Sequence, residues 1–521
     1  MTVLHKKTMK GFLLAALFAA LLAGIATPAG AAPKYGGTLR VIADTDINGL
    51  DPYKIGWQNH EVLRQIFEGL LAVDEGFKVI PGLAKSWDVS DDGLTYTFHL
   101  RKGITFHDGT KMTAEDVEAS LQRLLRSSIK QKFKDIESIA TPDPYTVEVT
   151  LSQPTATFLI NIAQPHVIGM MPKEEAEDEA NAKNIQHPVG TGPFEFVEWV
   201  PDRHVKLKRF EDYWGGEGKP TGTGGTKTAY VDEVVIIPLK ERSVRVASLE
   251  AGDGDLGFIP TTQKERLMRN DNLTIVGTGP TFDVWNFWFC VNDTSPLKDI
   301  NLRKAFAYAV NKGQMLTATT GGPGTVVNSV FPNFSAWYSK YHSPEYGQQQ
   351  DLEKAKAFLE KSDYSGETLT ITTCKDYTAM DKQAVVAQAQ LQQIGVKTKL
   401  EYLDWTSLFS KYKSGDFEIM SYGYGAHVDP DMYYYARLHS DNTYNGWGNK
   451  EFDKLVEQAK VESDFKKRKE LYSQAQKILV DELPLLPTFS EEYFYGYNNR
   501  VHGFKPWGAA FIRLWNIWLE Q

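Results

Sequence analysis

The chain has 521 residues, of which 42% are apolar and 24% charged, a composition typical of soluble globular proteins. So long a chain exceeds what one hydrophobic core sustains, so we expect two or three domains. The net charge of −9 argues against nucleic acid and anionic membranes as partners, because both repel an acidic protein.

The first 31 residues have the three-part pattern of a secretory signal peptide. Lysines form a positive region, an apolar run follows over residues 11–25, and small residues end the segment. Cleavage is expected after Ala31, since Ala29 and Ala31 supply the small side chains. A membrane anchor is the alternative, but the run is shorter than the roughly 20 residues that span a bilayer. We therefore expect an exported protein, with no cysteine near the cleavage site to carry a lipid anchor.

Beyond the signal segment, strand-like and helix-like segments alternate, which predicts an α/β protein in several domains. Helical spacing of apolar residues occurs at 59–71, 113–125, 243–251, 302–310, 352–361, 379–394, 405–413, 450–462 and 465–481. Strand-like segments are 38–43, 87–90, 95–100, 145–151, two within 190–208, 231–239, 282–291, 369–373, 397–402, 417–422 and the aromatic C-terminal region. Thr113 and Asp116 form a capping box, and the glycine-rich residues 215–227 predict a mobile surface loop.

Three short motifs are discounted. Residues 252–257 match GxGxxG, but a helical stretch precedes them and their aspartates would repel a pyrophosphate, so a turn is expected. His60 and Glu61 begin like a zinc-protease motif, but Arg64 takes the second histidine position. Residues 88–93 resemble the start of a calcium loop that lacks its closing glutamate. We therefore expect no metal and no cofactor.

The sequence carries no motif that pairs a nucleophile with a base, so we expect a protein that is not an enzyme. Its two cysteines, Cys290 and Cys374, could form a disulfide in an exported chain. Free buried cysteines are the other interpretation, because two distant cysteines rarely meet the disulfide geometry.

Several collinear segments carry a resemblance to a known family. They are residues 84–117 (AKSWDVSDDGLTYTFHLRKGITFHDGTKMTAEDV), 190–194 (GTGPF), 212–216 (DYWGG), 302–311 (LRKAFAYAVN), 422–431 and 449–453 (NKEFD). With them the chain resembles the large solute-binding proteins of ABC importers, a group that includes dipeptide, oligopeptide, glutathione and nickel binders. The resemblance extends from about residue 35 to residue 501.

The resemblance implies a periplasmic-binding-protein-like α/β fold, with two large lobes and a smaller inserted domain connected by a hinge. The residues alone indicate only several α/β domains. The implied division is a signal peptide at 1–31; lobe I at 32–70, 189–285 and 490–521; inserted domain II at 71–188; and lobe III at 286–489.

The resemblance also implies a function. We expect a periplasmic receptor that captures a peptide or peptide-like small molecule by hinge closure and delivers it to the ABC permease subunits in the inner membrane. We expect it to act as a monomer. The same role for an opine, a modified amino acid, a sugar or a metal chelate stays open, and a secreted hydrolase is the more remote alternative.

Two segments of the chain bear on the ligand. Peptide-binding members carry a Trp-x-(Gly/Ala)-Asp motif after the strand at 417–422; here Tyr424 stands at the Trp position and His427 at the Asp position. A neutral imidazole cannot hold an ammonium as a carboxylate does, which casts doubt on a standard free-amino peptide. Asp429 is either a replacement counter-ion or structural. Lys375 stands where dipeptide binders carry an arginine for the ligand carboxylate, unless it is simply solvated.

The high aromatic content, 12% of the chain, suggests that some rings line a ligand site. The candidate walls are Trp57, Phe282, Trp285 and Trp405. The alternative for each is a place in the hydrophobic core.

Overall fold

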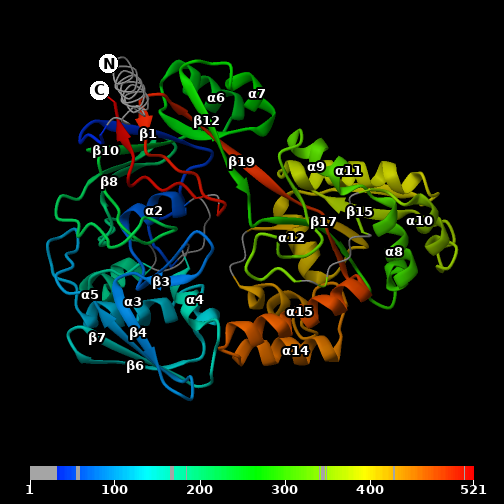
Figure 1. Cartoon of the computed structure of the whole chain (residues 1–521), viewed down its shortest axis with the longest axis horizontal. Coiled ribbons are helices and arrows are strands. Elements are labelled where there is room, and N and C mark those ends of the chain that lie inside the picture. Colours follow the sequence, from blue (N-terminus) through cyan, green and yellow to red (C-terminus); the bar gives the residue numbers. More distant parts are fainter. Residues whose placement is uncertain are drawn as a thin grey trace, which may run out of the picture.

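The computed structural model describes residues 32–53, 59–164, 169–182, 185–339, 341, 346–347, 349–425, 429–509 and 511–520. The predicted signal peptide and two candidate site residues, Trp57 and His427, lie outside these described residues. The described chain forms three bodies, each built around one sheet, and Figure 1 shows two of them stacked on one side and the third beside them.

The first body is built on an eight-stranded sheet with the strand order β12-β19-β11-β1-β10-β9-β8 and with β14 paired to β19. Seven of its strands come from three distant parts of the chain, and the eighth, β14, belongs to the chain segment of the third body and pairs with the start of β19. The strands are β1 (Thr38–Ala43), β8 (Phe194–Val200), β9 (His204–Arg209), β10 (Glu233–Pro238), β11 (Leu256–Ile259), β12 (Leu273–Pro280), β14 (Gly324–Val326) and β19 (Phe489–Asn498). Strand β1 is parallel to β10 and β11, so these three strands end at one edge. Helices α6 (Arg242–Ala251) and α7 (Lys264–Leu267) and the β20 (Val501–His502) and β21 (Trp518–Leu519) pair complete this body.

The second body is built on a four-stranded antiparallel sheet with the order β4-β5-β7-β6. Its strands are β4 (Ala84–Val89), β5 (Thr95–Leu100), β6 (Ile136–Asp143) and β7 (Thr146–Leu151). Helix α3 (Ala114–Leu125) begins at the predicted capping box: the backbone N–H of Thr113 donates to the Asp116 carboxylate at 2.7 Å. Smaller elements near this sheet are β2 (Leu71–Val73), β3 (Val79–Pro81), α4 (Phe158–Ala163) and α5 (Lys173–Glu177). Helix α2 (His60–Ile66) packs against β8 of the first body.

The third body is built on a five-stranded sheet with the order β16-β15-β17-β13-β18. Its strands are β13 (Val284–Phe289), β15 (Leu369–Thr373), β16 (Thr398–Tyr402), β17 (Ile419–Tyr424) and β18 (Leu485–Pro487). Its helices are α8 (Ile300–Ala309), α9 (Lys312–Thr320), α10 (Leu352–Leu359), α11 (Thr378–Gln392), α12 (Trp405–Ser414), α13 (Tyr434–Leu438), α14 (Lys450–Val461) and α15 (Phe465–Glu482). Alternate residues of β13 face opposite cores: Phe287 and Phe289 pack into one, and Trp288 packs into the other.

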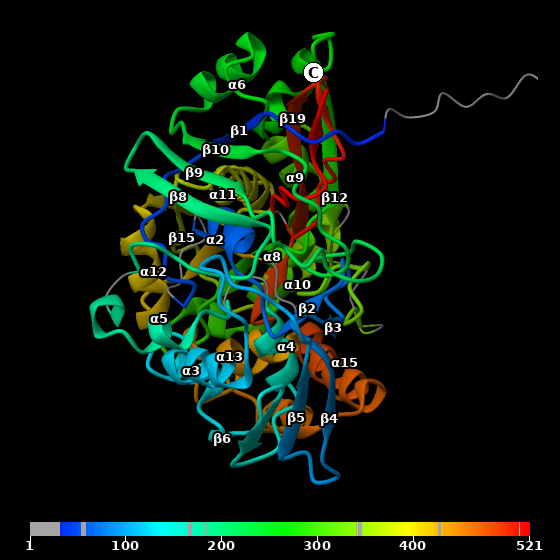
Figure 2. The same ribbon diagram turned by 90° about the vertical axis from the view of Figure 1, so that its left-hand side faces the viewer.

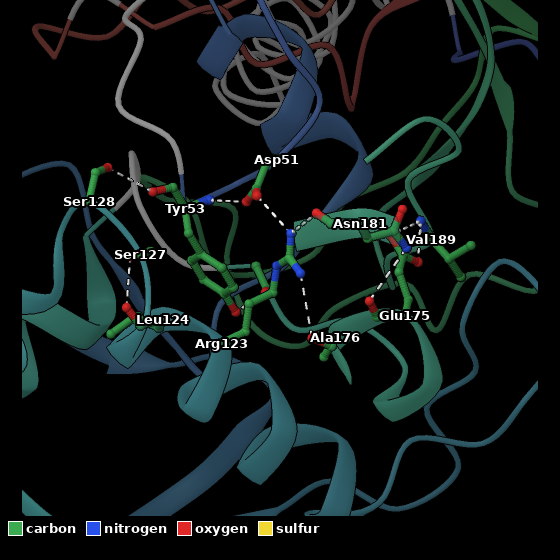
Figure 3. Close-up of polar contacts among 11 residues, drawn as sticks. Asp51, Tyr53, Arg123, Leu124, Ser127, Ser128, Glu175, Ala176, Asn181 and Val189 are labelled. Carbon is green, nitrogen blue, oxygen red and sulfur yellow. Dashed lines mark hydrogen bonds and ion pairs between the residues drawn. The ribbon is translucent and has the colours of Figure 1, made fainter. Parts of the chain in front are cut away.

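One continuous hydrophobic core joins the first and second bodies, because residues of both sheets belong to the same buried cluster. A buried ion pair reinforces this junction (Figure 3). The Arg123 guanidinium donates to Asp51 at 2.8 Å and to the carbonyl of Asn181 at 2.7 Å. These two bodies are therefore expected to move as one unit.

Two chain segments cross between that unit and the third body: the link from β12 to β13, and the start of β19. Figure 1 shows β19 running from the five-stranded body into the eight-stranded sheet. The two segments are bonded to each other, because the N–H of Thr281 donates to the carbonyl of Glu491 at 2.9 Å and the Ser490 hydroxyl donates to the carbonyl of Thr281 at 2.5 Å. The N–H of Thr488 donates to the carbonyl of Trp285 at 2.8 Å.

A second contact joins the bodies far from the crossing segments. The N–H of Ala156 donates to the carbonyl of Lys460 at 2.9 Å, and the Gln164 amide donates to the sulfur of Met432 at 3.4 Å. Figure 1 shows α4 facing α14 and α15 in this region. The third body thus touches the rest of the chain at both ends.

Two predictions from the sequence need correction. The helix expected at 59–71 ends at Ile66, and the apolar run continues into strand β2. The glycine-rich loop 215–227 lies at the surface as predicted, with residues 217–220 exposed, but it is tied by hydrogen bonds and is not loose throughout. The N–H of Lys227 donates to the carbonyl of Gly215 at 2.9 Å, and the Lys227 side chain is buried. Cys290 and Cys374 are both buried and free. None of the helices in the described part of the chain is long and apolar enough to cross a membrane.

We predict that Asp51→Asn destabilises the junction of the first two bodies. The change leaves the buried Arg123 without its counter-charge, which costs about 3–5 kcal/mol. Scanning calorimetry should show a lower unfolding temperature for the transition that involves these bodies. Asp481→Asn is the control, because it breaks only the exposed Lys477–Asp481 pair and should shift nothing measurable. Equal effects of the two variants would contradict the prediction.

Candidate ligand-binding site

The candidate site lies where parallel strands of two sheets end. In open α/β sheets, ligands bind beyond the carboxyl ends of the strands. At this edge of the eight-stranded sheet, Asp44 follows β1 and Arg242 begins the helix after β10. In the five-stranded sheet, β15, β16 and β17 are parallel and end at a common edge.

The two edges face each other. The Arg242 guanidinium donates to the hydroxyl of Thr378, which follows β15, at 3.5 Å. The pKa of Tyr377 is raised, mainly by burial, and the charge of Asp44 contributes across the gap between the bodies. Residues at this edge can therefore contact one ligand from two sides.

Aromatic rings line the five-stranded side of this site. Trp405 stacks on Tyr422, with ring centroids 5.6 Å apart, and contacts the edge of Tyr377 at 5.0 Å. Trp285 lies 6.3 Å from Tyr377. Tyr377 thus connects two rings that the sequence analysis proposed separately. It is 42% exposed, and its position just after β15 was the signal that could have identified it.

Phe282 lies apart from these rings, in the crossing segment. Its ring contacts Phe77, between β2 and β3 of the second body, at 4.7 Å and Phe334 of the third body at 5.2 Å. This places Phe282 at the connection between the bodies.

Tyr424 ends β17 and is buried within a cluster of tyrosines. Its hydroxyl contacts that of Tyr412, and its ring centroid lies 4.9 Å from that of Tyr433. The Arg437 guanidinium lies 4.5 Å from the Tyr424 ring centroid, in the geometry of a cation–π contact. Burial raises the pKa of Tyr424 well above its usual range, so its hydroxyl stays protonated.

Asp429 and Lys375 differ in whether their charged groups are open to a ligand. The Asp429 carboxylate is buried and forms a two-pronged ion pair with Arg468, one of whose contacts is 2.7 Å. It also accepts the N–H of Asp431 at 2.9 Å, which caps the short 3-10 helix Pro430–Met432. These bonds favour the structural interpretation of Asp429. Lys375 is exposed, and its ammonium lies 4.7 Å from the Tyr402 ring centroid.

Carboxylates that the sequence analysis missed lie on the opposite side and at the crossing. Burial raises the pKa of Glu491 to about 7, and the charge of Asp283 adds to the effect. Burial likewise raises the pKa of Glu61 to about 7, with a further contribution from Asp44. The Tyr493 hydroxyl donates to Asp283 at 2.9 Å. This side can attract a cationic group, and only the fold reveals it, because the four acids are far apart in sequence.

A separate cavity of about 60 Å³ lies within the first two bodies. Its buried Glu68 accepts hydrogen bonds from Tyr213 at 2.8 Å, Trp214 at 2.7 Å and Lys227 at 2.7 Å. The carboxylate is therefore satisfied, and the cavity is far smaller than the several hundred Å³ that a small-molecule ligand needs. Within the described ranges, no group of three or more His, Cys, Asp or Glu side chains is placed to hold a metal ion.

The fold defines a class: an α/β protein of two units that are joined by two crossing segments and whose sheet edges face each other. The model of the family described as bacterial extracellular solute-binding proteins, family 5 Middle, matches residues 78–446. The chain belongs to this family, as the resemblance predicted, and its periplasmic-binding-protein-like α/β fold is confirmed.

One related protein and two solved structures show how similar the chain is to known proteins. The chain is 30% identical to di/tripeptide-binding protein 1 of Pseudomonas aeruginosa over 497 residues, covering 88% of this chain and 89% of that protein. It is 27% identical to the periplasmic binding protein DppA from Helicobacter pylori in complex with the peptide STSA, with a TM-score of 0.76 over 94% of this chain and 99% of that one. It is also 27% identical to AgaA of A. tumefaciens R10 in complex with agropinic acid, with a TM-score of 0.74 over 93% and 99%.

We predict that Glu491→Gln makes the protein more stable at pH 8 and leaves it unchanged at pH 4. The pKa of this acid rises from about 4.5 in the unfolded chain to about 7 in the fold. Stability present below pH 4.5 is therefore lost as the pH rises toward 7, by on the order of 1–3 kcal/mol, and the amide avoids this loss. Chemical denaturation at the two pH values measures it, with the exposed Glu353→Gln as control. A pH-independent effect of Glu491→Gln would refute the assignment.

Proposed function

We propose that this protein is the extracytoplasmic receptor of an ABC importer and that it captures a peptide or peptide-like small molecule. The observation that carries the proposal is that the carboxyl edges of two sheets face each other across two hydrogen-bonded crossing segments. Similarity to the di/tripeptide-binding protein supports the peptide class.

Binding would proceed by closure of the third body onto the other two. Closure removes the rings of Trp405, Tyr377 and Trp285 from water, which supplies affinity, while charged groups set the orientation of the ligand. Phe282 and Tyr424 support these walls from the crossing segment and the tyrosine cluster. Trp57, His427, Asp429 and Lys375 stay candidates on the strength of the sequence.

The proposal also covers the location of the protein and its partners. Export by the signal peptide, without a lipid anchor, would place a monomer in the periplasm, where it hands its ligand to permease subunits of the inner membrane. A receptor of this kind performs no catalysis. We keep the division into lobe I, inserted domain II and lobe III with the predicted ranges. The four-stranded sheet, which lies within the range of inserted domain II, supports that part of it.

A second candidate ligand class is the opines and other modified amino acids. His427 in place of the family's aspartate favours it, because an imidazole provides no fixed negative charge for a free α-amino group. The similarity to AgaA, which was solved with agropinic acid, is consistent with this alternative.

Mass spectrometry of small molecules released from the denatured protein should yield a peptide or a modified amino acid. Isothermal calorimetry with dipeptides and tripeptides then tests the class, and we expect binding at micromolar concentration or tighter. Trp405→Ala should weaken binding about tenfold or more through lost apolar contact, whereas Phe465→Ala, an exposed ring on α15, should not. Release of a sugar together with no response to any peptide would overturn the proposal.

His427→Asp separates the two ligand classes in the same calorimetric series. If the ligand is a standard peptide, the new carboxylate should tighten the binding of free-amino dipeptides about tenfold or more and leave their N-acetyl forms unchanged. If wild type already binds free-amino dipeptides at micromolar concentration and His427→Ala changes nothing, position 427 plays no part in ligand choice.

A further inference from the structure

Arg437 is a partly buried cation with no carboxylate partner among the described residues. Its guanidinium lies against the Tyr424 ring, at 4.5 Å from the centroid, and its Nε is shielded from solvent without a hydrogen-bond acceptor in the described chain. Burial alone would lower the pKa of Arg437, but the surrounding tyrosine hydroxyls outweigh burial and raise it, so the residue stays charged.

Three other buried arginines of this protein have carboxylate or carbonyl partners for their guanidinium groups. Arg468 pairs with Asp429, and Arg123 pairs with Asp51. Arg303 donates to the carbonyls of Lys298 and Glu482, at 2.9 and 2.6 Å. A partly buried charge without such a partner is costly, so its retention calls for an occupant.

The surroundings of Arg437 suit an anion. Tyr424 contacts it and the Tyr412 hydroxyl is hydrogen-bonded to it. Tyr422 and Tyr433 complete the cluster by packing against these two rings. Their rings pack together, as in the 5.0 Å contact of Tyr422 with Tyr424 and the 4.8 Å stacking of Tyr412 on Tyr422. A planar guanidinium binds a carboxylate through two parallel hydrogen bonds, and aromatic walls strengthen that pairing by excluding water.

Arg437 also lies beside the candidate site. Tyr424, which it covers, is the last residue of β17 at the carboxyl edge of the five-stranded sheet. Helix α13 follows the Pro430–Met432 turn, whose Met432 contacts Gln164 of the other unit. Figure 2 shows α13 at the level of α3 and α4. An anion at Arg437 would thus lie close to the place where the bodies meet.

We propose that Arg437 anchors an anionic group of the ligand, a carboxylate in the first place, within the cluster of four tyrosines. The inference rests on the proposed function and specifies the ligand as an acid whose carboxylate docks on the third body. The carboxylates Glu491 and Asp283 would then face the cationic end of a zwitterion. Arg437, and not the exposed Lys375, is the carboxylate partner.

The test uses full-length mature protein and matched pairs of acids and amides. The probes are alanyl-phenylalanine and its C-terminal amide, with succinate and succinamide as the non-peptide pair. Of the two acids, the one that wild type binds more tightly should bind about 10- to 100-fold more tightly than its own amide, as measured by calorimetry. Arg437→Gln should abolish this preference by weakening the acid alone, and Arg437→Lys should restore part of it. Lys375→Gln should keep the preference.

The outcomes separate this inference from the proposed function. Binding of succinate with loss in Arg437→Gln, but no response to the dipeptide, would reject the peptide ligand and uphold the anion anchor. Equal weakening of acid and amide in Arg437→Gln would mean that the residue only supports the fold. Loss of the preference in Lys375→Gln alone, or no acid binding to wild type at all, would overturn the inference.

Discussion

The hydrogen bonds between the two crossing segments are the constraint on which the rest of the structure depends. Thr281, Ser490 and Thr488 are fully buried, and their backbone and hydroxyl bonds hold the segments side by side. Because only two segments connect the units, one unit can rotate relative to the other about these segments. Because the segments are bonded to each other, the rotation takes place about a single axis through both. The carboxyl edges of the two sheets are thereby kept opposite each other.

That constraint gives the site its chemical asymmetry. The eight-stranded side and the crossing contribute Asp44, Glu61, Asp283 and Glu491, whereas the third body contributes aromatic rings and Arg437. Charges of opposite sign on two facing surfaces favour closure and select ligands that carry both signs. At the far end, hydrogen bonds between the units join Ala156 with Lys460 and Gln164 with Met432, so a modest binding energy suffices to shift the equilibrium between open and closed forms.

Local features of the fold were predictable from the sequence. Strand β1, the hairpin of β4 and β5, and the capping box before α3 follow from short-range patterns. The helix predicted at 59–71 was too long at its C-terminal end. A short buried apolar run such as Leu70 and Leu71 occurs in helices and in strands alike, so its pattern does not distinguish them. Family resemblance, and not residue periodicity, supplied the discontinuous architecture.

The site was predictable only in part, for a physical reason. Trp405 and Trp285 were identified as single rings, but Tyr377 joins them only through tertiary packing. Asp429 and Arg468, which form an ion pair, are 39 residues apart in the sequence, so no local pattern predicts their pairing. No sequence pattern singled out Arg437, because only the fold places it against the Tyr424 ring.

If the two units close around a bound ligand, the protein becomes more compact, and small-angle X-ray scattering measures that change. The radius of gyration of the mature protein should be measured with and without a saturating concentration of the small molecule recovered from the protein by mass spectrometry. We expect a smaller radius of gyration in the bound state, since binding shifts the population toward the closed form. An unchanged radius at demonstrated saturation would contradict it.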